Sequence, residues 1–547
     1  MFASSPVNVD RLALELANHP DKSFVTALVD GFRAGFNTGI IASPEKTFEC
    51  KNLLSAKNNP EFVSQQLTKE VQLGYMLGGY TDPPFPDDYR VSPIGVAQHK
   101  FSGKKRLILD LSSPHNRQEI TSINDLIPRE HFRLSYVKVD DAITIIKQLG
   151  KGAWLTKLDI QDAFKIVPIM PSQWKHYCVK WQGLYYVFIR LPFGSRSSPF
   201  IFTQLSEAVA WIAKHNYGIP YLLFLLDDFL AVDKDFETAS QTKATLLKLF
   251  HDLGIPLNEK KTEGPVTSLT YLGVGLDTLE FKAFLPRDKL DRISSLLDFF
   301  MDRKKCTKRQ LLSLLGSLNF CARVVIPGRT FLCNLIERSK KVRQLHHFID
   351  LTSECKEDIF MWICLLKNWN GVSFFFDSEF CSTRDLTLYT DASSSFGFGA
   401  YLQSRQEFLF DSWINHPVPV SEHSLSYMEL YPIVASALVW GQFWKGKRIV
   451  FLVDNQGLSV ILAKGRAKSP AINQLLRRLV LVATTNHFTF TSSWLATSAN
   501  VLADALSRNN LSLFQDMAPA ATQVICPPST EIQLTYKQQF ASTGTMP

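Results

Sequence analysis

The stretch "FLLDDFLAV", residues 224–232, places two adjacent aspartates, Asp227 and Asp228, among seven apolar residues. An apolar run rich in Leu and Phe is typical of a buried strand. Burying one carboxylate without a partner costs free energy, and burying two neighbouring carboxylates costs more. The stretch therefore predicts a strand whose two acids need compensating charge. The preceding apolar run "YLLF" extends this expected strand to residues 221–232.

The rest of the chain sets the context for these acids. It has 547 residues, 46% apolar and 20% charged, with a formal net charge of +8. This length predicts three to five folded modules. Residues 286–343 hold 14 Lys and Arg against 5 Asp and Glu. Such a basic segment indicates either a polyanionic partner or a solvated helix face.

The nine cysteines are scattered and form no CxxC motif. This pattern predicts a reduced, intracellular protein (cytoplasmic or nuclear) without a zinc knuckle or a disulfide framework. The opening "MFASSPVNVD" lacks the basic and apolar regions of a signal peptide. Because no apolar run reaches the ~18 residues of a membrane span, we expect no membrane partner.

Hydrophobic patterning predicts an α+β, multidomain chain. Residues 91–285 alternate β-like runs with helical ones, and residues 385–508 repeat this alternation. Strands are expected at 106–112, 154–160, 176–181, 184–191, 221–232, 385–392, 396–403 and 407–413, and helices at 198–216, 236–253, 424–443, 469–485 and 500–508.

The remaining segments have less regular patterns. Residues 1–90 contain helical patterns and end in the Pro- and Asp-rich "YTDPPFPDDY" (80–89), which indicates a domain boundary. Residues 286–343 are expected to be helical and residues 344–384 to be a connector. The Pro-, Ala- and Thr-rich residues 509–547 predict a disordered tail or linker.

Asp159 lies at the end of another strand candidate, "WLTKLDI" (154–160), 68 residues before Asp227. Clustered carboxylates become tolerable where divalent cations neutralise them, and Mg²⁺ prefers oxygen ligands and leaves positions for phosphates. Two ions about 3.5–4 Å apart stabilise both the attacking and the leaving oxygens of phosphoryl transfer. The alternative is a pair of ordinary turn aspartates.

Further motifs follow in a fixed order around these acids. The basic "GKKRLILDLS" (103–112) suits a triphosphate, and the loop "LPFGSRSSP" (191–199) suits a nucleotide. "GIPLNEKKT" (254–262) and "LTYLGVGL" (269–276) come next. This ordered set resembles a reverse transcriptase: "LDIQDAF" is similar to motif A, "LPFGSRSSPFIF" to motif B, "LLDD" to motif C, "LNEKKT" to motif D and "YLG" to the primer grip.

The resemblance implies roles for particular residues. The metal ions would be bound by Asp159, Asp227 and Asp228. The dNTP would contact Lys105 and Arg106 through its triphosphate and would lie in a pocket lined by Phe193 and Gly194. Phe164 would exclude a 2′-OH, and Lys261 would protonate pyrophosphate. A core aromatic is the alternative for Phe164, and a solvated side chain is the alternative for Lys261. Leu225 and Leu226 stand where reverse transcriptases often carry Tyr and a small or Met residue, so the pocket wall would be aliphatic.

The basic segment contains "LLSLLGSLNF" (311–320), in which Gly316 and Phe320 share one helix face. A Gly inside a helix costs about 1 kcal/mol relative to Ala, so its presence indicates a close approach by another backbone. The segment resembles the thumb helix that follows the minor groove of a template–primer. Ordinary helix–helix packing is the alternative.

A second set of acids lies in residues 385–508. Asp391 ends a strand candidate in "LYTDAS", Glu429 lies in a helix, Asp454 ends the strand of "FLVDNQ", and Asp504 lies in "NVLADALSR". Four acids from different elements suit a two-metal nuclease. Together they resemble the Asp-Glu-Asp-Asp set of type 1 ribonuclease H, which cuts the RNA strand of an RNA/DNA hybrid.

Two details accompany that resemblance. Trp494 stands where related enzymes often carry a His, while His487 is expected to begin a strand. The basic side chains of residues 464–479 would grip the hybrid or form a solvated helix face: Lys464, Arg466, Lys468, Arg477 and Arg478.

The resemblance as a whole implies a right-hand polymerase with fingers, palm and thumb, a connector, and a ribonuclease H-like α/β domain. The expected partners are RNA template, DNA primer, RNA/DNA hybrid and dNTPs, with two Mg²⁺ (Mn²⁺ is possible) at each active site. "RLILDLSSPHN", "KGRAKSP" and "NVLADALSR" look most like DIRS-type retrotransposons, with Ty3-like elements and pararetroviruses as rivals. We find neither an Asp-Thr/Ser-Gly protease motif nor a His-His-Cys-Cys integrase finger.

Two other functions remain open at this stage. The chain could be a catalytically silent nucleic-acid-binding protein, or a ribonuclease H with a degenerate polymerase. Because all seven acids are present, the sequence favours the active enzyme over both. The sequence does not indicate the oligomeric state.

Overall fold

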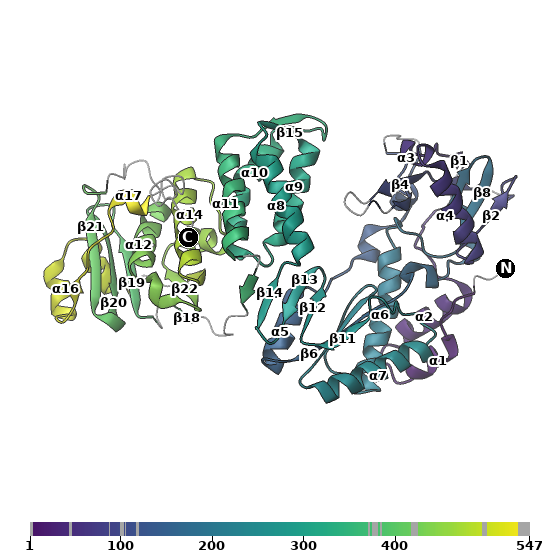
Figure 1. Cartoon of the computed structure of the whole chain (residues 1–547), viewed down its shortest axis with the longest axis horizontal. Helices are drawn as coiled ribbons and strands as arrows, with labels where there is room; N and C mark the ends of the chain where they lie inside the picture. Colours follow the sequence, from purple (N-terminus) through teal and green to yellow (C-terminus); the bar gives the residue numbers. More distant parts are fainter. Residues whose placement is uncertain are drawn as a thin grey trace. The chain divides into compact units, whose positions relative to one another are not determined.

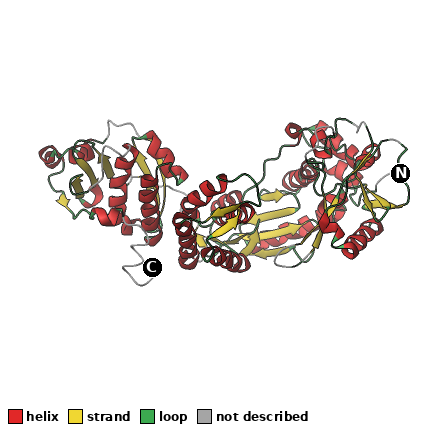
Figure 2. Cartoon of the chain, turned by 90° about the horizontal axis from the view of Figure 1, so that it is seen from above, coloured by secondary structure: helices red, strands yellow, loops and turns green. Residues whose placement is uncertain are grey.

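A computed structural model describes residues 4–42, 46–86, 88–98, 103, 105–115, 120–369, 372–374, 381–382, 386–416, 425–494 and 500–533. The chain divides into two compact units, Met1–Leu272 and Gly273–Pro547, and each combines helices with strands (Figures 1 and 2). No helix within the described ranges is both long and apolar enough to cross a membrane.

The N-terminal segment is part of the first unit and not a separate extension. A five-stranded sheet has the order β1 (Phe48–Glu49), β3 (Arg90–Val91), β7 (Cys178–Trp181), β8 (Leu184–Phe188) and β2 (Met76–Tyr80). The expected boundary at 80–89 is therefore wrong, because this stretch connects two strands of one sheet. The helices α1 (Val9–Glu15), α2 (Lys22–Ala34), α3 (Leu54–Lys57) and α4 (Pro60–Gln72) add their apolar residues to the same core.

The second sheet of this unit has the order β11 (Glu263–Val266), β6 (Trp154–Asp159), β10 (Asp228–Asp233) and β9 (Leu222–Leu225). The single strand expected over 221–232 is wrong, since the stretch folds into the β9–β10 hairpin. Leu226, with a φ of 54°, lies in its turn. The helices α6 (Ser198–His215) and α7 (Phe236–Asp252) match the expected 198–216 and 236–253, and β4 (Ile94–Gln98) pairs with β5 (Lys105–Leu109).

The second unit begins with β13 (Val274–Asp277) and β14 (Lys282–Phe284), and β14 pairs with β17 (Val372–Phe374). The helices expected in the basic segment are present as α8 (Arg287–Met301), α9 (Lys308–Cys321) and α10 (Cys333–Lys340). Thr307 and Gln310 form a capping box that starts α9. The strand β15 (Lys305–Thr307), which pairs with β16 (Phe348–Asp350), and the helix α11 (Ser353–Trp369) complete this part.

The rest of the second unit contains two further sheets. One joins β19 (Leu388–Ala392), β20 (Gly397–Leu402), β21 (Glu407–Ser412) and β24 (Thr522–Gln523), and the other joins β18 (Cys381–Ser382), β22 (Arg448–Val453) and β23 (Thr489–Trp494). The helix α12 (Leu425–Trp440) is apolar on all sides and buried, as expected for a core helix. The remaining helices are α13 (Gln456–Lys464), α14 (Pro470–Thr485) and α15 (Val501–Ser507).

The segment after Arg508 corrects the expectation of a disordered tail or linker. It forms α16 (Leu511–Met517), β24 and α17 (Ser529–Ile532). Phe514 is fully buried against Tyr401 and Phe408, with ring centroids 5.3 and 4.7 Å apart, and Ile532 is fully buried in the core. These apolar anchors are too widely spaced in a Pro- and Thr-rich stretch to give a periodic signal. Residues 534–547 lie outside the described ranges.

Candidate active sites

The three acids predicted from motifs A and C, here called the first acid set (Asp159, Asp227 and Asp228), lie together in the structure. The antiparallel register of β10 and β6 places Asp228 opposite Asp159. Asp227 occupies the adjoining turn, where its backbone carbonyl accepts from Ile160 N at 3.0 Å. Ser206 Oγ donates to the carbonyl of Leu226 at 2.8 Å, which fixes the turn. The hairpin thus answers why two charges sit in an apolar stretch: it carries them to Asp159.

The charges around the first acid set are unbalanced. Burial raises the pKa values of Asp227 and Asp228, and the negative charge of Asp159 raises both further. Two lysines oppose this effect: Lys261 Nζ lies 2.9 and 3.0 Å from the oxygens of Asp159, and Lys157 Nζ lies 3.5 Å from Asp228 Oδ1. Partly buried carboxylates with raised pKa values and oxygen donors only are a fitting ligand set for hard divalent cations.

Lys157 was not among the residues predicted from the sequence. A signal for it exists, because Lys157 and Asp159 are two residues apart on β6 and side chains two apart on a strand share a face. Lys261 was predicted, and its ammonium is indeed at the acid set. The side chain keeps 58% of its exposure, so Lys261 both contacts Asp159 and is solvated. The hydrogen bond to Asp159 raises the pKa of Lys261.

Some of the residues predicted to form the nucleotide pocket are in contact with one another. The rings of Phe164 and Phe193 lie 4.8 Å apart; Phe193 is 60% exposed, and Phe164 is 7% exposed and also contacts Phe202. Phe164 thus has the contacts of a core aromatic and supports an exposed ring. Gly194 has a φ of 101°, and a Cβ there would lie 2.6 Å from the Leu109 carbonyl oxygen, so only glycine fits.

The strand β5 does not bring the side chains of Lys105 and Arg106 to one place. They are consecutive residues of β5, and consecutive side chains of a strand point to opposite faces. Arg106 shares an exposed face with Ile108, while Lys105 lies on the half-buried face. The strand therefore directs only one of the two toward a given ligand. Lys104, the other basic residue of this motif, lies outside the described ranges.

The exposed face of α9 (Lys308–Cys321) carries Gly316 and Phe320. Within the described chain, a Cβ added at Gly316 would meet no atom within 4 Å, so helix–helix packing is the wrong explanation for this glycine. The Phe320 ring has Lys289 Nζ at 4.4 Å and the Arg323 guanidinium at 5.4 Å. Phe320 also approaches Gly273 of the "YLG" motif. The face is thus open and bordered by cations.

The acids Asp391, Glu429, Asp454 and Asp504, here called the second acid set, come from β19, α12, the turn after β22, and α15. Burial raises the pKa of Glu429 to about 9, with further contributions from Asp391 and Asp454. Burial likewise raises the pKa of Asp391, with contributions from Asp504 and Asp454. These mutual effects show that the four carboxylates share one electrostatic environment, and their chemistry fits divalent cations as well.

The last helix is held against the strand that carries Asp391. Ser507 Oγ donates to Asp391 Oδ2 at 2.5 Å, and Asn500 Nδ2 donates to the Thr390 carbonyl at 2.8 Å. A Cβ at Gly399 would lie 2.3 Å from Leu506 Cβ, so this glycine permits the close approach of α15. Ser507 and Asn500 are site residues that the motif comparison did not single out.

Trp494, which replaces the expected His, lies beside the second acid set. Its indole Nε1 donates to the Asp454 backbone carbonyl at 3.0 Å, and the side chain is 57% exposed. His487 lies in the turn that precedes β23, at the opposite end of that strand. Residues 495–499 of the loop lie outside the described ranges. The indole thus fixes the backbone at Asp454 but has no basic nitrogen to offer.

The five basic residues predicted to contact an RNA/DNA hybrid fall into two groups, one exposed and one with partners inside the protein. Lys464, Arg466 and Lys468 are exposed and line one hollow of the second unit, together with Lys340. Arg477 instead forms an ion pair with the fully buried Asp358. Arg478 is buried and donates to the Glu531 carbonyl at 3.0 Å. Both arginines also line this hollow, but their guanidiniums already neutralise or cap groups inside the protein, so a contact with a hybrid would compete with these partners.

Known proteins resemble the part of the chain that carries the first acid set. The family model described as "Reverse transcriptase (RNA-dependent DNA polymerase)" matches residues 86–276. The Gag-Pol polyprotein of avian reticuloendotheliosis virus is 24% identical over 246 residues, which cover 43% of this chain and 19% of that polyprotein. The Pol polyprotein from transposon opus of Drosophila melanogaster is 22% identical over 286 residues, which cover 50% and 26%.

Among solved structures, a foamy viral protease-reverse transcriptase in complex with double-stranded DNA is 15% identical, with a TM-score of 0.49 and coverage of 90% of this chain and 83% of that one. The chain spans about a quarter or less of the two polyproteins. Residues 86–276 form a reverse transcriptase domain of the retroviral and retroelement Pol type.

Proposed function

We propose that the chain is an RNA- and DNA-directed DNA polymerase that also cleaves the RNA strand of RNA/DNA hybrids. The observation that carries the polymerase is the β10–β6 register, which brings Asp228 opposite Asp159 with Asp227 in the adjoining turn. In this reading the five-stranded sheet belongs to the fingers, the acid-bearing sheet is the palm, and α8 to α10 form the thumb. Residues 344–384 are the connector, and the ribonuclease H domain includes the folded tail to residue 533.

Residues at and near the first acid set would have separate roles in nucleotidyl transfer. Two divalent cations, Mg²⁺ before Mn²⁺, would stabilise charge on the attacking and leaving oxygens when bound to the three carboxylates. Lys261, whose raised pKa keeps it protonated, lies where it can donate a proton to the departing pyrophosphate. The exposed Phe193 ring, backed by Phe164, offers a surface for the sugar and base, and Arg106 offers a cation to the triphosphate.

Leu225 and Leu226 give this polymerase an aliphatic wall beside the acids. Leu225 pairs with Asp228 across the hairpin, and Leu226 packs against the core of the first unit. This contact orients the turn through packing alone and offers no hydroxyl to the nucleotide.

The ribonuclease H activity rests on the second acid set. Burial, together with repulsion from the neighbouring acids, raises the pKa values of Asp391 and Glu429, and binding of cations there would offset both effects. The bond from Ser507 to Asp391 Oδ2 positions α15 over the site, and within this helix Arg508 holds the Asp504 side chain at 2.7 Å. With Trp494 in place of a His, product release would lack a basic side chain, and cleavage would be slower than synthesis.

The retroelement type is part of the proposal. The sequence motifs "RLILDLSSPHN" and "NVLADALSR" support a DIRS-type element over a Ty3-like one or a pararetrovirus. The genomic sequence that continues the coding region tests this assignment. A tyrosine recombinase frame agrees with it, and an integrase frame contradicts it.

Primer extension by the full chain with a labelled DNA primer, an RNA template, dNTPs and Mg²⁺ tests the polymerase. Asp227→Asn is expected to reduce incorporation at least about a hundredfold, since loss of metal-assisted charge stabilisation costs several kcal/mol. Asp140→Asn, which changes an exposed acid of the α5 helix (Val139–Leu149), is the matched control and should retain activity. Absence of incorporation by the unaltered chain, or equal incorporation by Asp227→Asn, would contradict the proposal and favour a silent binding protein.

Cleavage of a labelled RNA/DNA hybrid tests the nuclease. Asp391→Asn should lose cleavage, whereas Asp516→Asn, at an exposed acid of α16, should retain it. Hybrid cleavage without primer extension would instead favour a ribonuclease H with a degenerate polymerase.

A further inference from the structure

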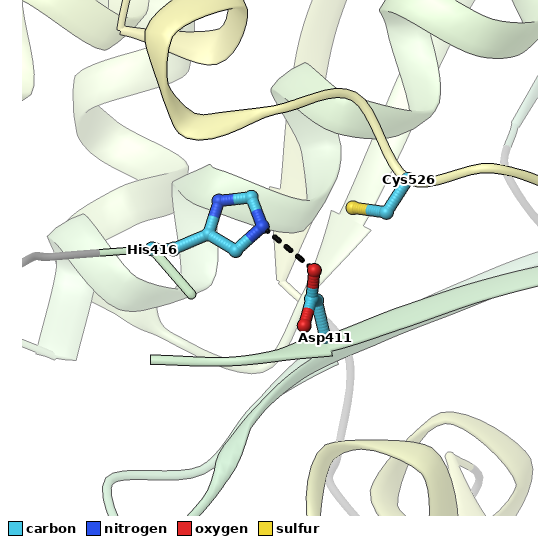
Figure 3. A group of neighbouring side chains, drawn as sticks. All are labelled: Asp411, His416 and Cys526. Carbon is cyan, nitrogen blue, oxygen red and sulfur yellow. Dashed lines mark hydrogen bonds and ion pairs between the residues drawn. The ribbon is translucent and has the colours of Figure 1, made fainter. Parts of the chain in front are cut away.

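A third group of potential metal ligands lies in the second unit, and its members belong to neither acid set. Within the part of the chain that the structure describes, Asp411, His416 and Cys526 are the group of His, Cys and acidic side chains whose ligand atoms all lie within 4.8 Å of one another. Figure 3 shows the three side chains converging. His416 Nε2 is 3.0 Å from Asp411 Oδ2, and the Cys526 sulfur lies beside this pair.

The three residues come from two segments that are far apart in the sequence. Asp411 is near the end of β21, His416 follows in the next turn, and Cys526 lies three residues after β24. The chain near Cys526 is already fixed to β21, since Val524 N donates to the Phe408 carbonyl at 2.8 Å. A group bound by all three would therefore join the C-terminal segment to the first strands of this domain.

For Asp411 and His416, the atom that would not face a metal is held by another group. Asp411 Oδ1 accepts from Asn415 Nδ2 and from Ser412 N, both at 2.8 Å, which leaves Oδ2 directed at the cluster. His416 Nδ1 lies 2.9 Å from the Tyr431 hydroxyl, which leaves Nε2 directed at the cluster. Metal-binding imidazoles and carboxylates are oriented in this way in known sites.

The surroundings are apolar and enclosed. His416 is 2% exposed, and its ring contacts Phe398 and Tyr431 at centroid distances of 5.1 and 5.6 Å. Asp411 keeps 26% of its exposure, which gives solvent and ions a route to the site. A dry shell strengthens coordination by thiolate and imidazole.

From this geometry we propose that Asp411, His416 and Cys526 bind one Zn²⁺ ion that fastens the C-terminal segment to the ribonuclease H-like part of the chain. One sulfur, one imidazole nitrogen and one carboxylate oxygen are ligands that suit zinc better than the hard cations of the two acid sets. Zinc bonds of about 2.0–2.3 Å place tetrahedral ligands about 3.3–3.8 Å apart, so the side chains need to move by about 1 Å. Water would take the fourth position.

Protons balance in this binding step. The Cys526 thiol, which burial keeps protonated in the metal-free protein, releases its proton to solvent as its sulfur binds. Binding through Nε2 displaces the proton that His416 Nε2 directs at Asp411 Oδ2; exchange through solvent places a proton on Nδ1, where it is donated to the Tyr431 oxygen. Asp411 supplies Oδ2 as a carboxylate ligand. The ion's charge of +2 then meets two ligand charges of −1.

Titration of the full, EDTA-treated chain with Co²⁺ in excess Mg²⁺ tests the proposal, because Mg²⁺ fills carboxylate sites and thiolate–cobalt bonds absorb in the near ultraviolet. One equivalent of Co²⁺ should produce this band together with tetrahedral visible bands, and Zn²⁺ should abolish them. Cys526→Ser should lose the near-ultraviolet band. Cys50→Ser, at a similarly half-buried cysteine of the first unit, should keep it.

A second variant keeps the test decisive if Cys526→Ser does not fold. Asp411→Asn preserves the size and most hydrogen bonds of the carboxylate and is expected to weaken Co²⁺ binding at least about tenfold. The proposal is overturned by absence of the near-ultraviolet band in the unaltered chain, or by an unchanged affinity in Asp411→Asn. Neither result depends on polymerase or ribonuclease H activity, since the readout is spectroscopic.

Discussion

The two acid sets compensate their negative charge by different means. Asp159 and Asp228 of the first set have lysine ammoniums at 2.9 and 3.5 Å. In the second set, the described ion pair joins Arg508 to the half-exposed Asp504, while the buried Glu429 has a pKa of about 9 and is therefore protonated at neutral pH. Without metal, lysines offset part of the charge of the first set, and a proton on Glu429 offsets part of the charge of the second. The two sets should therefore respond differently to lysine removal and to pH.

Removing Lys261 should have the largest effect of the changes that probe this difference. Lys261→Gln takes away the cation at Asp159 and the proposed proton donor, and is expected to lower the primer-extension rate about a hundredfold. Lys260→Gln, at the exposed neighbouring residue, is the control. Single-turnover extension measures the effect, and hybrid cleavage should be unchanged. A rate equal to that of the control would show that Lys261 only balances charge.

The second acid set should respond to pH. The folded-state pKa of Glu429 is raised from 4.5 to about 9, so the stability that its proton contributes is complete below pH 4.5 and is lost as pH rises through about 9. In Glu429→Gln the side chain stays neutral, so the melting temperature of the metal-free chain should exceed that of the parent by a few degrees at pH 9.

Thermal unfolding between pH 5 and pH 9 in EDTA measures this effect. Glu280→Gln, at an exposed acid of the same unit, should follow the parent at every pH. Added Mg²⁺ should stabilise the parent more at pH 9 than at pH 6, because fewer protons then compete for the site. Parallel curves for the parent and Glu429→Gln would exclude protonation as the means of compensation.

A smaller effect is expected on the open face of α9. Since a Cβ at Gly316 meets no described atom within 4 Å, Gly316→Ala should stabilise the chain by about 0.5–1 kcal/mol through helix propensity. The same change should weaken template–primer binding several-fold if a nucleic-acid backbone approaches Gly316. Ser313→Ala, at an exposed residue of the same helix, is the control for the binding measurement. Unchanged affinity in Gly316→Ala would place the duplex elsewhere.

Motif order predicted both acid sets because the acids lie at strand ends or on helices whose patterns are strong. It also predicted Lys261 as the proton donor to pyrophosphate, and the structure places its ammonium 2.9 Å from Asp159. It did not single out Lys157, although the spacing of two residues from Asp159 on β6 is a signal for a shared face. Nor could it show that Arg477 and Arg478 have partners, because Asp358 and Glu531 are 119 and 53 residues away.

The fold was less predictable where Pro-rich or aperiodic stretches have the composition of a linker. The Pro-rich 80–89 stretch has the composition of a linker, yet it connects β2 and β3 of one sheet because the pairing is nonlocal. The segment after Arg508 lacks periodicity, yet Phe514 and Ile532 anchor it by burial. The cluster of Asp411, His416 and Cys526 also escapes any spacing rule, since 110 residues separate His416 from Cys526.

The central claim is that one chain carries two separate metal-dependent sites. The most direct test follows one RNA template–DNA primer labelled on both strands, so that DNA extension and RNA cleavage are measured in the same reaction. Asp227→Asn should abolish extension and leave cleavage of a preformed hybrid intact, and Asp391→Asn should abolish cleavage and leave extension intact. Loss of both activities in either folded variant, or loss of neither, would contradict the account.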